Sequence, residues 1–141
     1  MTIAIINTDM NIGPFKIPGN GQNMILNNYA ERNKIIVEEI IPEPFMSNAL
    51  ATTQWVHRKK KLKKVILCSI HQLPQEKKRI DDLINSMSEV EFHFALEGIS
   101  GTGGKFLQDC IKEAKIFKEA DAIDSTKTTW SELYKLKQKN E

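Results

Sequence analysis

Two side chains that could exchange a proton with a substrate stand at the ends of apolar runs typical of buried strands. His71 follows the run from Lys64 to Ile70, and Glu97 closes the run that begins at Glu91. A carboxylate is a common general base, and an imidazole titrates near neutral pH. The sequence therefore offers Glu97 and His71 as acid or base residues, with a plain loop position as the alternative for His71.

Amide and hydroxyl side chains occur in segments that should border the same site. Gln22 and Asn23 open a predicted helix, and a side-chain amide offers a donor and an acceptor to a sugar hydroxyl or a carboxylate. Capping of the loop backbone is the alternative use of these amides. Three further polar residues are expected to bind a ligand with them, namely Asn7, Thr8 and Ser47.

The glycine-rich stretch from Gly98 to Gly104 leads into another predicted helix. Backbone N–H groups and the helix dipole at such a point could hold a phosphate or carboxylate. The pattern differs from the P-loop and from the dinucleotide-binding motif. We expect Ser100, Gly101 and Thr102 to contribute to an anion site, with a helix-capping turn as the alternative.

The remaining charged residues indicate no metal and no cofactor, and contact with nucleic-acid phosphates is the alternative use of one basic run. The basic run from His57 to Lys64 lacks interleaved aromatic residues that could stack on bases, which favours a solvated helix end. His93 shares a strand face with Glu97, and a hydrogen-bonded core histidine is its favoured role. The three histidines show no metal-ligand spacing.

Composition predicts one water-soluble domain. The chain has 141 residues and a net charge of +2, with ordinary apolar and charged fractions. Cys68 and Cys110 are expected to be free, buried thiols in a reducing cytoplasm. No signal segment is visible, and no apolar run approaches the roughly 20 residues of a membrane helix. We expect a core over residues 1–120 and a short helix with a polar tail over 121–141.

Alternating apolar runs predict an α/β fold. Strands are expected at 2–7, 34–41, 64–70 and 91–97, with Pro42 and Pro44 ending the second. Helices are expected at 22–33, at 48–61, after Pro74 and at 105–119, and a last one from Thr129. This pattern favours a four-stranded, mainly parallel sheet of order 2-1-3-4 with helices on both faces. The loops 7–21, 42–48, 69–74 and 97–104 should then meet at the carboxyl rim of the sheet.

Two segments resemble the catalytic domain of serine recombinases of the resolvase/invertase family. The stretch from Leu96 to Gln108 is similar to the strand-loop-helix segment before the long helix of that domain. The stretch from Ile5 to Asp9 stands where the family has Arg-x-Ser-Thr-Asp. The resemblance covers about residues 3–118 and implies a resolvase-like three-layer sandwich.

The same resemblance implies that the recombinase chemistry is absent. The family's catalytic serine falls on Asn7 and its neighbouring arginine on Ile5. His71, Gln72 and Gln75 stand where the family has Asp-Arg-x-x-Arg. A recombinase needs the serine as nucleophile and the arginines to stabilise charge on the phosphate. We therefore expect no DNA cleavage.

A second resemblance is to small uncharacterised proteins of sporadic bacterial carbohydrate-biosynthesis gene clusters. The matching words are Ile17-Pro18, Gln22-Asn23, Tyr29, Ser47, Leu73-Pro74 and the stretch from His93 to Glu97. This resemblance implies a role in the biosynthesis of surface carbohydrates or unusual sugars. It does not imply a particular reaction.

The leading hypothesis is a small cytoplasmic protein that binds a polar or anionic sugar metabolite at the carboxyl rim, with catalysis left open. The alternatives are a non-catalytic oligomerising or regulatory domain derived from a serine recombinase, and a nucleic-acid-associated protein. A homodimer is expected because apolar residues cover a wide arc of the helix at 105–119. The segment around Trp130 is the other possible cover for that arc.

Overall fold

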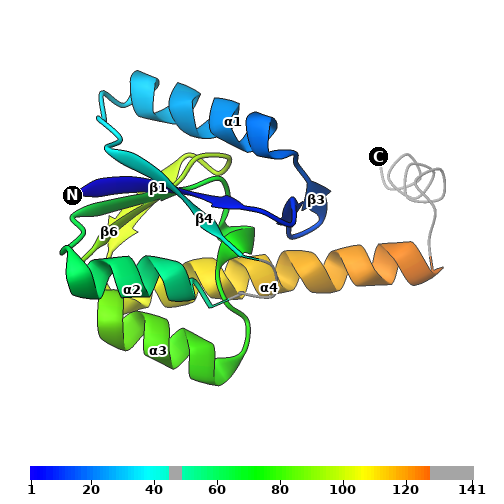
Figure 1. Ribbon diagram of the computed structural model, residues 1–141. Coiled ribbons are helices and arrows are strands. Elements are labelled where there is room, and N and C mark those ends of the chain that lie inside the picture. The colour runs from blue at the N-terminus through cyan, green and yellow to red at the C-terminus, as the bar shows by residue number, and fades with distance from the viewer. Residues whose placement is uncertain (45–48, 128–141) are drawn as a thin grey trace.

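The computed structural model describes residues 1–44 and 49–127. A sheet of five strands, in the order β4-β1-β5-β6-β7, forms its centre (Figure 1). The strands are β1 (Thr2–Asn7), β4 (Glu39–Glu43), β5 (Lys64–Leu67), β6 (Glu91–Phe94) and β7 (Ile99–Thr102). The first four are parallel to one another, as expected for alternating strands and helices.

The fifth strand corrects the expected four-stranded sheet. β7 pairs antiparallel with β6, from Phe94 opposite Ile99 to Glu91 opposite Thr102. The chain reverses at Gly98, whose φ of +66° suits a residue without a side chain and whose N–H donates to the Phe94 carbonyl at 2.9 Å. The glycine-rich stretch is therefore an edge strand that runs back toward the amino ends of the parallel strands.

Helices cover both faces of the sheet. Helix α1 (Gly19–Arg32) lies on one face, and α2 (Ala51–Lys59), α3 (Lys77–Met87) and α4 (Gly104–Lys127) lie on the other (Figure 1). Strand β1 serves both layers, because Ala4 packs with the residues under α1 whereas Ile3 and Ile5 pack into the larger core on the other side.

The strand ends differ from the expected ones. Strand β4 includes Pro42, which was expected to end it; as an edge strand it tolerates a residue without an N–H. Strand β5 ends at Leu67, and a single 3-10 turn, η1 (Ile70–Gln72), follows it. Strand β6 ends at Phe94, so that Glu97 lies in the turn beyond the strand.

The expected loop at 11–21 contains a small hairpin of two short strands, β2 (Asn11–Ile12) and β3 (Phe15–Lys16). Ser47 and the expected helix from Thr129 lie outside the described residues. Within the described part of the chain, no helix has the length and apolar character needed to cross a membrane.

Candidate functional site at the carboxyl end of the sheet

The carboxyl end of β1 is tied to helix α1 by one buried amide. Gln22 is fully buried, and its Oε1 accepts the N–H of Asn7 at 2.7 Å. Its Nε2 donates to the carbonyl of Asn7 at 2.9 Å and to that of Ile17 at 2.8 Å. The amide of Gln22 therefore has its donors and its acceptor occupied by backbone, so its role is to fix the rim.

The side chain of Asn7 continues this network. Its Oδ1 accepts from Nε2 of Gln72 at 3.0 Å, and its Nδ2 donates to the carbonyl of Asn11 at 2.9 Å. The Oε1 of Gln72 in turn accepts the N–H groups of Cys68 at 2.7 Å and Ser69 at 3.2 Å. An amide at position 7 thus joins β1 to the segment after β5 and to the β2-β3 hairpin.

Glu97 lies at the same rim, and both of its carboxylate oxygens accept hydrogen bonds. The hydroxyl of Ser69 donates to Oε2 at 2.8 Å, and the N–H of Ile70 donates to Oε1 at 2.8 Å. The carboxylate therefore caps the start of η1 from the turn that follows β6. The geometry brings Glu97, Asn7 and Gln22 into one chain of contacts through Ser69 and Gln72.

His71 stands on η1 with its ring between two aromatic side chains. The ring centroid lies 6.0 Å from that of Phe15 and 5.2 Å from that of Phe117, both at steep angles. Burial lowers the pKa of His71 from its usual 6.5, against the opposing effect of the carboxylates of Glu97 and Glu113. Its surroundings therefore favour the neutral imidazole.

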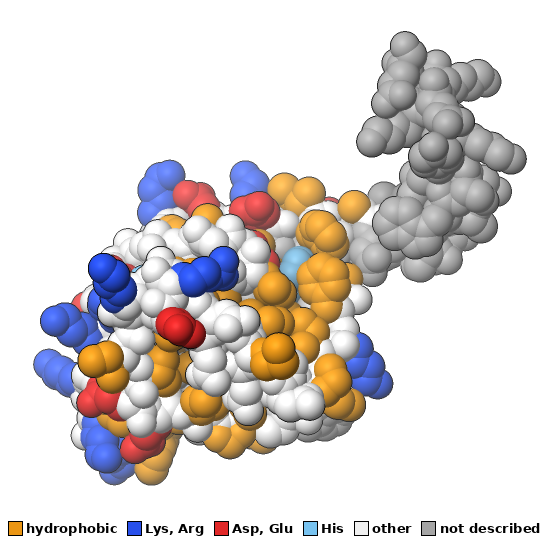
Figure 2. Space-filling view, turned by 90° about the horizontal axis from the view of Figure 1, so that it is seen from above, with side chains coloured by type: hydrophobic (Ala, Val, Ile, Leu, Met, Phe, Trp, Pro, Cys, Tyr) orange, Lys and Arg blue, Asp and Glu red, His pale blue; other side chains and the backbone are white. Residues whose placement is uncertain are grey.

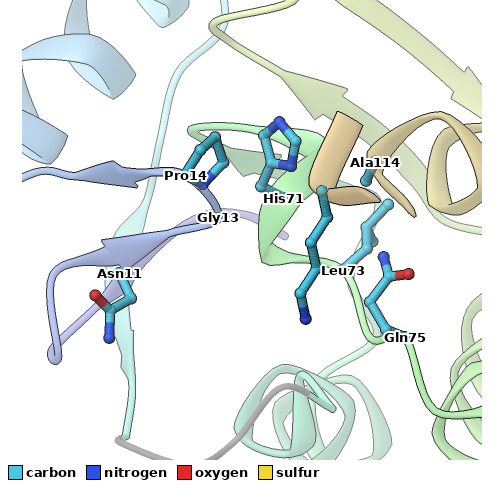
Figure 3. Close-up of a pocket in the computed structure, with 8 residues that line it drawn as sticks. Asn11, Gly13, Pro14, His71, Leu73, Gln75 and Ala114 are labelled. Carbon is cyan, nitrogen blue, oxygen red and sulfur yellow. The ribbon is translucent and has the colours of Figure 1, made fainter. Parts of the chain in front are cut away.

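A cavity of about 340 Å³ opens beside His71. Asn11, Gly13 and Pro14 of the hairpin lie on one side of it, and Leu73, Gln75 and Ala114 lie on the other (Figure 3). Lys118 of α4 completes the lining. Asn11, Gln75 and Lys118 were not among the expected site residues; Gln75 had been singled out only by its place in the recombinase pattern.

The structure places the other expected ligand-binding residues in different surroundings. The hydroxyl of Thr8 donates to the Glu43 carbonyl at 3.1 Å, which ties it to the end of β4. Asn23 is half-buried, and its Oδ1 is enclosed with no hydrogen-bond partner in the described part of the chain. Thr8 directly follows β1, and Asn23 lies near the start of α1.

Ser100, Gly101 and Thr102 do not join the rim, because β7 carries them away from it. Thr102 pairs with Glu91 at the first residue of β6, the amino end of that strand. Gly101 lies against the ring of Phe106, and a Cβ at this position would come within 2.6 Å of that ring. The glycine is thus explained by close packing, and the expected anion site of this segment is not formed next to Glu97.

His93 is a buried core residue with two partners. Its Nε2 lies 2.8 Å from Oε2 of Glu91, and its Nδ1 lies 2.7 Å from the hydroxyl of Tyr29. The hydrogen bond from His93 is the main cause that lowers the pKa of Glu91, while burial raises that of Tyr29. The contact between Tyr29 and His93 joins α1 to β6.

The basic run begins with a histidine that faces inward. Nδ1 of His57 accepts the N–H of Leu62 at 2.9 Å, and its Nε2 lies 3.0 Å from Oε1 of Glu89. Arg58, Lys59, Lys60 and Lys61 are exposed at the end of α2, where cations interact favourably with the helix dipole.

One buried carboxylate was not among the residues predicted from the sequence. Glu43 ends β4 at 2% exposure, and its Oε1 accepts both the N–H and the hydroxyl of Thr53 at 2.7 Å. Its Oε2 accepts the N–H of Thr52 at 3.3 Å. The signal available in the sequence was a Thr-Thr pair in the first turn of a helix that lacks a capping side chain at Leu50.

Both cysteines are free and buried, as expected. Burial is the main cause that raises the pKa of Cys68 to about 12 and that of Cys110 to about 11. Neither thiol is therefore a nucleophile at neutral pH. Among the described residues, no group of three or more His, Cys, Asp or Glu side chains is placed to hold a metal ion.

Comparison with solved structures identifies a fold neighbour. The N-terminal catalytic domain of TP901-1 integrase, a serine recombinase, aligns with a TM-score of 0.59 and 16% sequence identity, over 86% of this chain and 99% of that domain. No protein-family model and no curated protein matches the chain. The likeness shows a recombinase-like fold, and the resemblance to carbohydrate-cluster proteins stays a hypothesis.

Proposed function

We propose that this chain is a non-catalytic assembly domain with the recombinase fold, which forms a homodimer through the second half of α4. The observation that carries this proposal is the exposure of that half. Leu107, Cys110, Ile111 and Ala114 are buried, whereas every residue from Lys115 to Ala120 is exposed. The helix nevertheless continues to Lys127, beyond the edge of the sheet (Figure 1).

A helical extension without packing is marginal on its own. Isolated helices shorter than about 12–15 residues have little stability in water, and most helices in proteins depend on a buried apolar face. Ile116 and Phe117 remain 59% and 49% exposed on this extension. A second copy of the chain can cover these side chains through a two-fold contact in which the same surface is used twice.

The surface next to the extension is also apolar. We call Phe15, His71, Ile116 and Phe117 the rim patch. Phe15 is 44% exposed, and its ring lies 6.5 Å from that of Phe117. Figure 2 shows hydrophobic side chains gathered around a histidine on this side of the molecule. Exposed apolar patches of this kind are typical of interaction surfaces.

The polar groups of the rim support the non-catalytic part of the proposal. A nucleophile or general base needs a group that is free to meet the substrate. The amides of Asn7 and Gln22 and both oxygens of Glu97 make hydrogen bonds within the protein. We therefore expect no covalent protein–DNA adduct in a cleavage assay, and detection of one would contradict this part.

Sedimentation velocity at increasing protein concentration tests the dimer. The wild-type chain should sediment as a dimer, and Phe117→Lys should sediment as a monomer with the circular dichroism spectrum of the folded chain, because Phe117 is 49% exposed. Ile36→Lys is the matched control, since Ile36 is 83% exposed in the loop before β4. A wild type that is monomeric at about 100 μM, a concentration at which a dimer with a dissociation constant of about 1 μM is largely assembled, would refute the proposal. A Phe117→Lys variant that remains dimeric would also refute it.

A second candidate function is the binding of a polar or anionic sugar metabolite at the carboxyl rim. The cavity of about 340 Å³ beside His71 favours it, because small-molecule sites are concave and carry a few polar groups. A thermal-shift screen against nucleotide sugars, sugar phosphates and acidic sugars tests it. A raised unfolding temperature with one of these compounds is expected, and no response across the three classes would argue against this candidate.

A further inference from the structure

The cavity beside His71 has walls that are held in place before any ligand arrives. The turn of the hairpin packs so closely on η1 that a Cβ on Gly13 would lie 2.5 Å from Cβ of His71. The side chain of Asn7 ties the hairpin to β1 by donating to the Asn11 carbonyl at 2.9 Å, and the N–H of Ile17 closes the base of the hairpin by donating to the Met10 carbonyl at 2.8 Å. A preformed cavity loses little conformational entropy when it binds.

Two of the donors that line this cavity, on Gln75 and Lys118, are free, whereas the amide of Asn11 donates to Oδ2 of Asp9 at 3.4 Å. No hydrogen bond or ion pair joins the side chain of Gln75 or Lys118 to the described part of the chain. The lining residues that the structure describes include no carboxylate, and Lys118 is their one permanent charge. The carboxylates of Glu97 and Glu113 act on His71 but do not line the cavity, and both oxygens of Glu97 accept hydrogen bonds from Ser69 and Ile70.

We infer that this cavity binds a small anionic group, a phosphate or a carboxylate, with the ammonium of Lys118 as its charge partner and the amide of Gln75 as a hydrogen-bond donor. This inference deepens the second candidate function and rests on its cavity. The imidazole of His71 borders the same space and can donate a further hydrogen bond when it is protonated. An ammonium and an amide are point donors that suit a tetrahedral or planar oxyanion.

The test is a titration of the full-length chain with inorganic phosphate, monitored by ¹H–¹⁵N correlation spectra. A titration with potassium chloride at equal ionic strength is the reference. Phosphate should shift the signals of residues around Gly13, His71 and Gln75. Lys118→Met should raise the dissociation constant by roughly tenfold, the usual effect of losing one hydrogen bond to a charged group. Lys112→Met is the matched control, because Lys112 is exposed on the same helix and does not line the cavity.

The inference is overturned if phosphate shifts no cavity signal beyond the chloride reference, or if the two lysine variants weaken binding equally. Uncharged sugars in the same titration separate this failure from that of the second candidate. If they shift the cavity signals and phosphate does not, the cavity binds sugars without an anion site. Sedimentation of the same samples reports the dimer separately.

Discussion

At the scale of single residues, the amide of Gln22 is predicted to matter for stability. Gln22→Leu keeps the size of the side chain but leaves the N–H of Asn7 and the carbonyl of Ile17 without their partner. The carbonyl of Asn7 loses one of its two donors and keeps the N–H of Met10 at 3.1 Å. Each unpaired group of this kind costs about 1–3 kcal/mol, so we expect a loss of about 3 kcal/mol in the free energy of unfolding. Urea denaturation measures it, with Gln108→Leu as an exposed control expected to change by less than about 0.5 kcal/mol.

Gly13 gives a second prediction at this scale. Its φ of +62° is strained for any residue with a side chain, and an alanine Cβ would also collide with His71. We expect Gly13→Ala to destabilise the fold by at least about 2 kcal/mol. Gly19→Ala is the control, since no atom lies within 4 Å of its added Cβ and alanine favours helices by up to about 1 kcal/mol. Equal thermal unfolding temperatures for the two variants would contradict this account.

The sequence identified the polar residues of the rim but not their partners. Gln22 was expected to orient a ligand, and Glu97 to act as an acid or base, because their residue types are suited to such work. Their actual partners are 15 residues away at Asn7, and 27 and 28 residues away at Ile70 and Ser69. Contacts across such distances depend on how the strands align, and no local pattern encodes them.

At the scale of elements, the strands that carry continuous apolar runs were predicted well and the short polar ones were not. β5 reads as a buried strand because Val65, Ile66 and Leu67 are all buried. β7 consists of Ile99, Ser100, Gly101 and Thr102, and two of its four residues are exposed. Its strand conformation depends on pairing with β6 and on the reversal at Gly98, so composition alone favoured a loop.

The start of helix α2 offers a prediction at the same scale. Glu43→Ala removes the carboxylate that accepts the N–H groups of Thr52 and Thr53 and the hydroxyl of Thr53. Loss of a capping side chain costs about 0.5–2 kcal/mol, and the buried donors left behind raise that cost, so we expect about 3 kcal/mol. Amide hydrogen exchange at Thr53 should accelerate most. Glu39→Ala, exposed on the same strand, is the control and should leave that exchange unchanged.

At the scale of the whole molecule, the sequence predicted the parallel core and both helical layers, but not the outer edge of the sheet or the length of α4. The expected helix ended near residue 119, whereas α4 continues to Lys127. Its first part could be predicted because Leu107, Cys110, Ile111 and Ala114 follow the helical period and bury one face. In the second part Ile116 and Phe117 are exposed instead of buried, which agrees with a face completed by another molecule.

Assembly through the rim patch should weaken as the pH falls, because His71 lies within that patch. Burial already lowers the pKa of His71 below 6.5 in the single chain, against the effect of Glu97 and Glu113. A second copy that covers Phe15 and Phe117 would bury the imidazole further and lower its pKa again. The separated chains then bind more protons than the dimer, so acid favours dissociation.

The lowered pKa of His71 sets the pH range in which the dimer should dissociate. The dimer should be fully favoured above pH 6.5, the usual pKa of histidine, and should lose affinity as the pH falls below it. Each protomer contributes one imidazole, so the dissociation constant can rise by up to roughly a hundredfold per pH unit. Glu91, whose pKa lies below its usual 4.5, titrates in a lower range and should not contribute here.

Sedimentation equilibrium between pH 5.5 and pH 7.5 measures this dependence, with circular dichroism to verify that the chain stays folded. His71→Phe is the matched variant, because it keeps an aromatic ring between Phe15 and Phe117 and cannot titrate. Its dimer should persist across the whole range. A wild-type dimer that is equally tight at both ends of the range, or a His71→Phe variant that still dissociates in acid, would separate the rim patch from the dimer interface and assign assembly to another surface.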